Sequence, residues 1–373
     1  MFIEKNNILL KITVKVGELM IDLKVDLIKG NILKSLIIFA IPIFISNVFQ
    51  QLYNTMDTMI VGNYLGDVSL AAIGACAAIY ELLIGFALGI GNGLSIVTAR
   101  CYGKKDEELL KKSVAGSIVI GIFITVLIMI ISKLCLFPLL QLLNTPENII
   151  EESYSYISMV TLFVGVMFAY NLCAGLLRAI GNSFMPLIFL IISSVLNVFL
   201  DILFITKFNM GIRGAASATV IAQGISAILC IMYIYKKAHI LIPSRRHFVF
   251  DKELYKELVG QGFSMGFMLC IVSTGTVILQ TAINNLGYLI IAGHTAARKL
   301  SSFCMMPAGT IALSVSTFVS QNKGANQGVR IRKVIRYANM LVISWGIIIS
   351  LILLIVSPYL VKFLSGSSEA VVI

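Results

Sequence analysis

Long apolar runs separated by short polar connectors dominate the chain. A run of about 20 apolar residues can cross the hydrocarbon core of a bilayer as a helix. We identify nine such runs, at about 33–62, 68–100, 112–136, 153–177, 184–206, 213–236, 257–283, 289–320 and 334–364. The pattern therefore predicts an all-α, polytopic membrane protein with nine transmembrane helices.

The apolar runs also repeat along the chain. A gapless shift that brings Asn63 onto Asn284 superimposes the first three runs on the last three, and the basic pair 111–112 then meets the basic pair 332–333. A six-helix unit repeated in one orientation relates its halves by an axis along the membrane normal. We therefore expect two six-helix lobes in a pseudo-twofold arrangement, with the second lobe incomplete.

This repeat divides the chain into four segments. We expect an N-terminal cytoplasmic extension at 1–29, a first six-helix lobe at 30–236, a cytoplasmic linker at 237–256 and an incomplete second lobe at 257–373. Our interpretation is a C-terminally truncated member of a twelve-helix architecture, and the alternative is a genuine nine-helix protein. Because residues 1–19 look foreign to the rest, a further hypothesis is that translation starts at Met20 rather than Met1.

Composition and charge support the membrane assignment and fix an orientation. Hydrophobic residues make up 58% of the chain and charged residues 13%, whereas soluble domains average about 45–50% and about 25%. The net charge is +11, and the basic residues gather in alternate connectors, around 100–112, 236–256 and 323–336. By the positive-inside rule these connectors and the N-terminus are cytoplasmic. Since no basic stretch alternates with stacking aromatic residues, we expect no nucleic-acid partner.

The spacing of the cysteines and histidines, and the lack of enzyme motifs, argue against metal-binding proteins and enzymes. The seven cysteines are scattered without CxxC spacing, which indicates neither a disulfide framework nor a metal site. No histidine has a second ligand at metal spacing. The GIGNG segment at 89–93 lies inside an apolar run with no strand before it, which favours helix packing over phosphate binding. We therefore predict no enzyme and no cofactor.

Three acidic residues interrupt the apolar runs of the first half: Asp57, Glu81 and Asp201. A charged side chain at membrane depth costs about 2.5–3.5 kcal/mol on insertion scales, so it persists mainly where it faces a cavity, a partner or a translocated ion. Asn197 precedes Asp201 by four residues, which places both on one helix face, about 6 Å apart at Cβ. Thr219 is an intramembrane hydroxyl in the next run.

Two carboxylates, an amide and a hydroxyl are suitable ligands for Na⁺, and the carboxylates are equally suitable for a proton. We predict an ion site formed by Asp57, Asn197, Asp201 and Thr219, with no other metal. The alternative is that Asp57 hydrogen-bonds within its own helix and Asp201 lies in water at the outer interface. Sequence alone does not show that these helices meet.

The same region contains candidates for substrate binding and for a hinge. Glu81 either attracts a cationic substrate or pairs with a neighbouring helix, and we group it with Tyr53 and Asn54 as a candidate substrate pocket. Pro42 lies inside the first apolar run, where proline removes a backbone hydrogen bond and permits a kink. We predict a conformational hinge there, and a merely curved helix is the alternative.

Four segments in this order resemble the multidrug and toxic compound extrusion (MATE) transporters: NVFQQLYNTMDTMIVGNYLG (47–66), GNGLSIVTARCYGKKD (91–106), LLRAIGNSFMP (176–186) and NMGIRGAASATVIAQ (209–223). The resemblance covers about 26–364. It implies two six-helix lobes in a V shape, in a monomeric, multi-pass protein of the plasma (inner) membrane. It also implies export of amphipathic organic cations in exchange for inward H⁺ or Na⁺.

The resemblance also implies roles for individual residues of this chain. The family's first-lobe ion site matches Asp57, Asn197, Asp201 and Thr219, and the helix-1 proline whose bending is proposed to couple ion binding to drug release resembles Pro42. The helix-7 glutamate of one branch has no equivalent in 257–283. The predicted function is a cation-coupled multidrug antiporter. The alternatives are a lipid-linked oligosaccharide flippase of the same superfamily, which would need a more cationic cavity, and an inactive truncated transporter.

Overall fold

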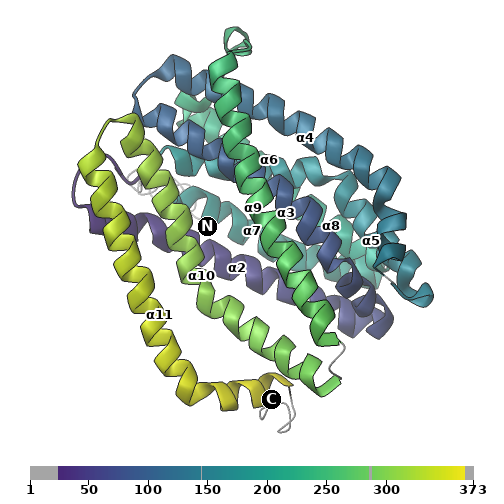
Figure 1. Ribbon diagram of the computed structural model, residues 1–373. Coiled ribbons are helices and arrows are strands. Elements are labelled where there is room, and N and C mark those ends of the chain that lie inside the picture. The colour runs from purple at the N-terminus through teal and green to yellow at the C-terminus, as the bar shows by residue number, and fades with distance from the viewer. Residues whose placement is uncertain (1–23, 144, 285–287, 366–373) are drawn as a thin grey trace, which may run out of the picture.

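The computed structural model of the protein describes residues 24–143, 145–284 and 288–365, and its regular elements there are all helical (Figure 1). The long helices are α2 (Ile32–Leu65), α3 (Asp67–Gly103), α4 (Glu107–Leu142), α5 (Glu147–Leu162), α6 (Val164–Ala179), α7 (Phe184–Ile202), α8 (Ile212–Lys237), α9 (Lys252–Asn284), α10 (Tyr288–Gly324) and α11 (Gly328–Ser365). Short helical turns occupy Leu203–Lys207, His239–Leu241 and Arg245–His247. The expected start at Met20 lies outside the described residues.

Eight helices in the described part are long and apolar enough to cross a membrane, and the count rises to nine if the bent pair α5 and α6 forms one span. The prediction of an all-helical, polytopic membrane protein is confirmed. The pair α5 and α6 was expected as one continuous helix over 153–177, but its two parts meet at 48°. The backbone leaves the helical conformation at Phe163, with φ −107° and ψ 20°. No proline marks this position, so the apolar pattern did not reveal the break.

The helices extend beyond the apolar runs because polar residues cap them. The Asn31 side chain accepts a hydrogen bond from the Lys34 amide at 3.0 Å, and the Asp106 side chain accepts one from the Leu109 amide at 2.9 Å. Such caps satisfy the free amides of a first helical turn. Hydropathy alone had placed the start of α4 at about 112, five residues inside its real end at Glu107.

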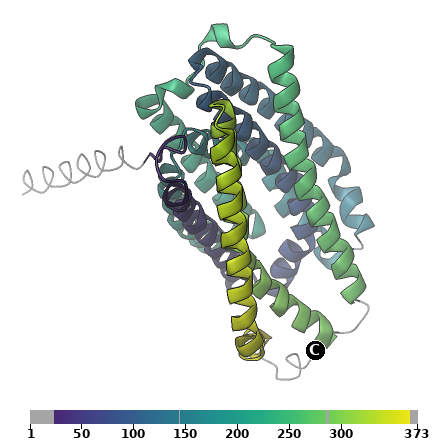
Figure 2. The same ribbon diagram turned by 60° about the vertical axis from the view of Figure 1, so that its left-hand side comes forward.

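Helices α3 to α8 pack into one bundle around a shared apolar core. In this bundle α3 contacts α4, α5 and α6, and α8 contacts α6 and α7. Fully buried side chains from four of these helices, such as Ile84, Leu94, Ile124, Ile157 and Leu177, make the core continuous. Helices α9, α10 and α11 lie along one side of the molecule, with α9 across α3 and α11 at the outer edge (Figures 1 and 2).

Helix α2 contacts both groups of helices. Its first half buries Phe39 and Ile43 in a cluster with Phe318 of α10 and Val334 of α11. Its second half buries Ile60 and Val61 against Ile205, in the helical turn after α7, and Ala215 of α8. The first predicted lobe therefore begins with a helix that joins the two groups.

Glycines allow the backbones of α3 and α9 to touch. Gly89 and Gly93 share one face of α3, and Gly262 and Gly266 share one face of α9. A Cβ atom added to Gly93 would lie 2.7 Å from the Gly262 Cα, and one added to Gly89 would lie 2.7 Å from the Gly266 Cα. Small residues spaced by four permit such close crossings in membranes. The GIGNG segment therefore packs against a helix, as its apolar context predicted.

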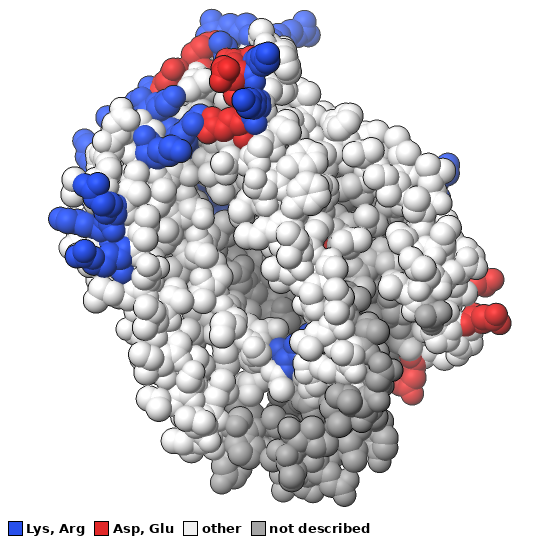
Figure 3. Space-filling model, in the orientation of Figure 1, with Lys and Arg blue, Asp and Glu red and all other residues white. Residues whose placement is uncertain are grey.

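A second close contact closes the end of the molecule where most basic residues gather, which we call the charged end (Figure 3). There the ends of α3 and α10 meet, and a Cβ on Gly103 would overlap the backbone of Gln321. Arg100 of α3 also forms an ion pair with Glu257 of α9. The face in view is hollowed below the charged end (Figure 3). The two groups of helices are thus in contact at the charged end.

Candidate functional site

Three helices bring the predicted ion-site residues together inside the protein. Asp57 lies in the second half of α2, Asn197 and Asp201 lie in the last turns of α7, and Thr219 lies near the start of α8; α7 packs against both other helices. Asp57 is 8% exposed, and Asn197 and Asp201 are fully buried. The alternative of Asp201 in water at the interface does not fit this burial.

Asn197 connects α7 to α8 and orients Asp201. In the amide orientation that satisfies both partners, its nitrogen donates to Asp201 Oδ2 at 3.0 Å and its oxygen accepts from the Thr219 backbone amide at 3.3 Å. The i, i+4 spacing in α7 makes the first contact possible. This amide therefore positions one carboxyl of the cluster.

The Asp57 and Asp201 carboxyl groups lie within hydrogen-bonding reach of each other. Two ionised carboxylates are both acceptors and repel each other, so a contact of this kind requires a proton or a cation between them. Oδ1 of each residue is buried and has no hydrogen-bond partner among the described residues. The pair of carboxyls is therefore compatible with a bound proton or a bound Na⁺.

Two further buried polar side chains lie on α2 and α8, the helices that carry Asp57 and Thr219. The Tyr53 hydroxyl, which we had assigned to a substrate pocket, is buried close to Thr219 without a hydrogen bond in the described part. Gln223 is 6% exposed, and its Oε1 also has no described partner. Sequence reasoning missed Gln223, although its position one turn after Thr219 on α8 was the available signal. The Tyr53 hydroxyl thus adds an oxygen near the two carboxyls, and Gln223 adds a buried amide oxygen further along α8.

Two further tyrosines lie near Asp57. Tyr80 of α3 and Tyr156 of α5 lie close enough to interact electrostatically with its carboxyl group. Tyr80 precedes the predicted residue Glu81, but we had given it no role. Aromatic side chains from two other helices therefore lie in the surroundings of Asp57.

The structure does not bring Asn54 and Glu81 into this cluster. Both side chains are exposed. Asn54 lines a cavity of about 570 Å³ with Thr58, Asn63 and Asp67, and Asp57 is not among its lining residues. A role for Asn54 and Glu81 in binding substrate stays a prediction.

Pro42 lies in a continuous part of α2. The Ser46 hydroxyl donates to the Pro42 carbonyl at 2.8 Å, and one residue later the Asn47 amide donates to the Thr310 hydroxyl of α10 at 3.0 Å. The helix is unbroken here, so the hinge also stays a prediction.

A short π-helix at Leu203–Lys207 begins two residues after Asp201. Such turns are frequent at functional sites.

No group of three or more histidine, cysteine or acidic residues is arranged to hold a metal in the part of the chain that was described. All seven cysteines have free thiols.

Comparison with known proteins identifies the family. A family model described as MatE matches residues 42–203 and 265–373, which is most of the chain. The chain belongs to the MATE family. The resemblance seen in the four sequence segments is therefore confirmed, and so is the prediction of a transporter rather than an enzyme. Transporters of the MATE family are ion-coupled.

Two relatives and two solved structures show the extent of the similarity. The chain is 32% identical to "Probable multidrug resistance protein YoeA" of Bacillus subtilis over 345 residues, which cover 90% of this chain and 74% of YoeA. It is 24% identical to "Probable multidrug resistance protein NorM" of Thermotoga maritima over 351 residues, covering 91% of this chain and 74% of NorM. A MOP superfamily transporter from Pyrococcus furiosus matches with a TM-score of 0.85 at 22% identity, covering 93% of this chain and 78% of that one. A MATE transporter in an outward-facing conformation also matches with a TM-score of 0.85 at 22% identity, covering 94% of this chain and 78% of that one.

Proposed function

We propose that this MATE protein is a cation-coupled antiporter that exports amphipathic organic cations across the plasma membrane by alternating access. Relatives named for multidrug resistance or export support drug-like small molecules as substrates. The observation that carries the proposal is the buried pair of Asp57 and Asp201, held by Asn197 and left with unpartnered oxygens.

In this mechanism the two carboxyls interact in turn with the organic cation and with the coupling ion. When the pair is ionised, its negative charge attracts an organic cation in the cavity between the lobes. When H⁺ or Na⁺ arrives from outside, it neutralises the pair, and the attraction for the organic cation is lost. A ligand shifts a conformational equilibrium only by its different affinities for the two states. Each elementary charge that moves down a potential of 100 mV supplies about 2.3 kcal/mol, so an ion gradient is a sufficient energy source.

The site chemistry is compatible with either coupling ion. A proton needs only the two facing carboxyls, whereas Na⁺ prefers several oxygen ligands. The hydroxyls of Tyr53 and Thr219 are the candidates for additional ligands. Ethidium efflux from vesicles with a separately imposed pH or Na⁺ gradient distinguishes the two ions.

The direct test is ethidium efflux by cells that carry Asp57→Asn. The amide keeps the shape of the side chain but cannot bind a proton or balance a cation, so we expect efflux to fall at least about tenfold, which corresponds to about 1.4 kcal/mol. Glu253→Gln is the matched control, because Glu253 is exposed at the start of α9 and its substitution should leave efflux unchanged. Full efflux by Asp57→Asn would remove this residue from the mechanism.

A further inference from the structure

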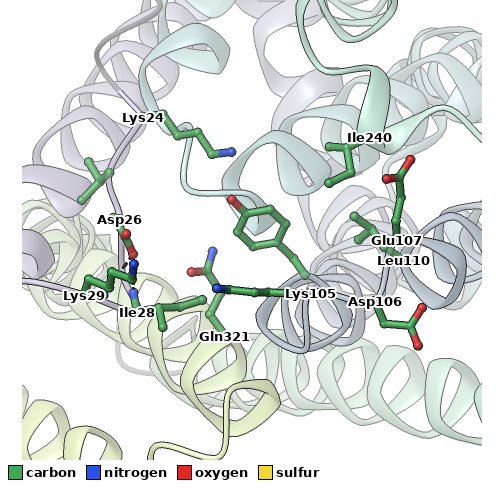
Figure 4. Close-up of a pocket in the computed structure, with 12 residues that line it drawn as sticks. Lys24, Asp26, Ile28, Lys29, Lys105, Asp106, Glu107, Leu110, Ile240 and Gln321 are labelled. Carbon is green, nitrogen blue, oxygen red and sulfur yellow. Dashed lines mark hydrogen bonds between the residues drawn. The ribbon is translucent and has the colours of Figure 1, made fainter.

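Residues 24–30, which we call the N-terminal strap, lie ahead of α2 at the charged end. They border a cavity of about 410 Å³ that is also lined by the end of α3, the start of α4 and Gln321 of α10. Lys24, Asp26 and Lys29 lie across this cavity from Asp106 and Glu107 (Figure 4). The strap therefore lies where the two groups of helices meet.

One end of the strap is attached to the first group of helices. The Val25 amide donates to the Gly181 carbonyl at 2.9 Å, and the Lys24 ammonium group lies 4.8 Å from the centre of the Tyr102 ring. Gly181 is in the left-handed conformation, with φ +90°, between α6 and α7, and a Cβ there would overlap the Val25 carbonyl. Glycine is thus required at this position both for the turn and for contact with the strap.

The other end is attached to the second group by a larger set of hydrogen bonds. The Arg330 guanidinium of α11 donates to the carbonyls of Leu27, Lys29 and Gly30 at 3.1, 3.2 and 2.8 Å. The Asn322 amide of α10 donates to the same Leu27 carbonyl at 2.9 Å. These donors reach three of the four backbone carbonyls of residues 27–30.

The donors themselves are held in place. Asn322 Oδ1 accepts from Arg330 Nε at 3.1 Å, and the guanidinium carbon lies 5.5 Å from the centre of the Phe318 ring. The Leu27 side chain is fully buried against Phe318 and Val334. Apolar packing and charge-assisted hydrogen bonds therefore fix the strap on α10 and α11 together.

A strap bonded to both groups opposes their separation at the charged end. We propose that residues 24–30 form a cytoplasmic latch, and that opening the charged end requires the strap to leave either Gly181 or the Asn322–Arg330 pair. This inference rests on alternating access in the proposed function. Because the strap continues directly into α2, the latch and Asp57 lie on one continuous segment of chain.

The latch can be tested by measuring the distance across the charged end. Spin labels replace Lys104 and Lys323, both exposed, in the full chain with its seven cysteines changed to serine or alanine, reconstituted in lipid nanodiscs. We expect mainly a short distance in the parent, with a minor long-distance fraction that is at least threefold larger in Arg330→Gln. Arg330→Lys keeps the charge but loses the fork that reaches three carbonyls, so it should fall between them.

Two further variants make the result decisive. Arg332→Gln is the matched control, because Arg332 is exposed two residues further along α11, and it should match the parent. Asp26→Ala removes the carboxylate that accepts from the Ile28 and Lys29 amides at 2.8 and 3.0 Å. It loosens the exposed turn of the strap and leaves Arg330 itself in place. It therefore keeps the test valid if Arg330→Gln does not fold, and the long-distance fraction should again rise.

Identical distance distributions in the parent, Arg330→Gln and Asp26→Ala would overturn the latch. The readout is a distance and not transport, so this failure is distinct from failure of the proposed function. That failure would appear as undiminished ethidium efflux by Asp57→Asn, whatever the distances show.

Discussion

The strap ahead of α2 and the ion site in the second half of α2 differ in how their polar groups are hydrogen-bonded. At the strap, the carbonyls of Leu27, Lys29 and Gly30 all accept hydrogen bonds from Arg330. By contrast, four of the seven buried side-chain polar atoms that have no partner in the described part belong to α2, α7 and α8, the helices of the ion site. Buried polar groups normally find partners, and those that do not are costly.

This difference separates a structural role from a chemical one. The bonded strap favours one arrangement of the helices. If the strap detached from α11, three backbone carbonyls and the Arg330 guanidinium would lose their hydrogen bonds. A cluster with unpartnered oxygens favours whatever ion or proton can complete it. Since α2 connects the two regions, a change in charge at Asp57 acts on the same helix that begins at the strap.

The largest effect should come from removing both carboxyls of the pair. Asp57→Asn and Asp201→Asn should each lower ethidium efflux at least about tenfold, and the double variant should lose no more than the worse single one. Residues that act as one unit are strongly non-additive. Efflux measured in all three variants checks this, and losses that simply multiply would show that the two carboxyls act independently.

The next largest effect should follow Asn197→Ala. This change removes the donor to Asp201 and the acceptor from the Thr219 amide, which corresponds to about 1–3 kcal/mol for buried groups. We expect efflux to fall about tenfold, with the native fold retained. Asn171→Ala is the control, because Asn171 donates only to Met167 in its own helix. Equal efflux by the two variants would contradict a positioning role for Asn197.

A smaller effect should appear at the α3–α9 crossing. In Gly93→Ala the new methyl group meets the Gly262 backbone at 2.7 Å, and overpacking of this kind costs about 1–3 kcal/mol. Gly85→Ala on the same helix meets nothing within 4 Å and should be neutral or slightly stabilising. Thermal unfolding in detergent compares them, and equal melting temperatures would show that the crossing tolerates separation.

Much of the fold could be predicted because membrane burial imposes a simple rule on sequence. A spanning helix must be apolar over most of its length, so the runs located the helices, whereas the division into two lobes stays a prediction. The break at Phe163 was missed because both sides of it are equally apolar. Helix ends at Glu107 and Gly103 were missed because the polar caps lie outside the apolar runs.

The site was partly predictable for a related reason. Asp57 and Asp201 stand out because acidic residues are costly at membrane depth, and Asn197 follows from helical spacing. Gln223 does not stand out, because a single amide is tolerated in many helices. The strap was not predicted at all, since its contacts are made by backbone carbonyls and its sequence carries no motif.

The central claim is that one cation competes with substrate for Asp57 and Asp201. The most direct test is the affinity of the purified full chain for ethidium, measured by fluorescence while the H⁺ and the Na⁺ concentrations are raised separately. The account predicts that affinity falls as one of these ions rises in the native protein and stays constant in Asp57→Asn. Native affinity that is unchanged by both ions would contradict it.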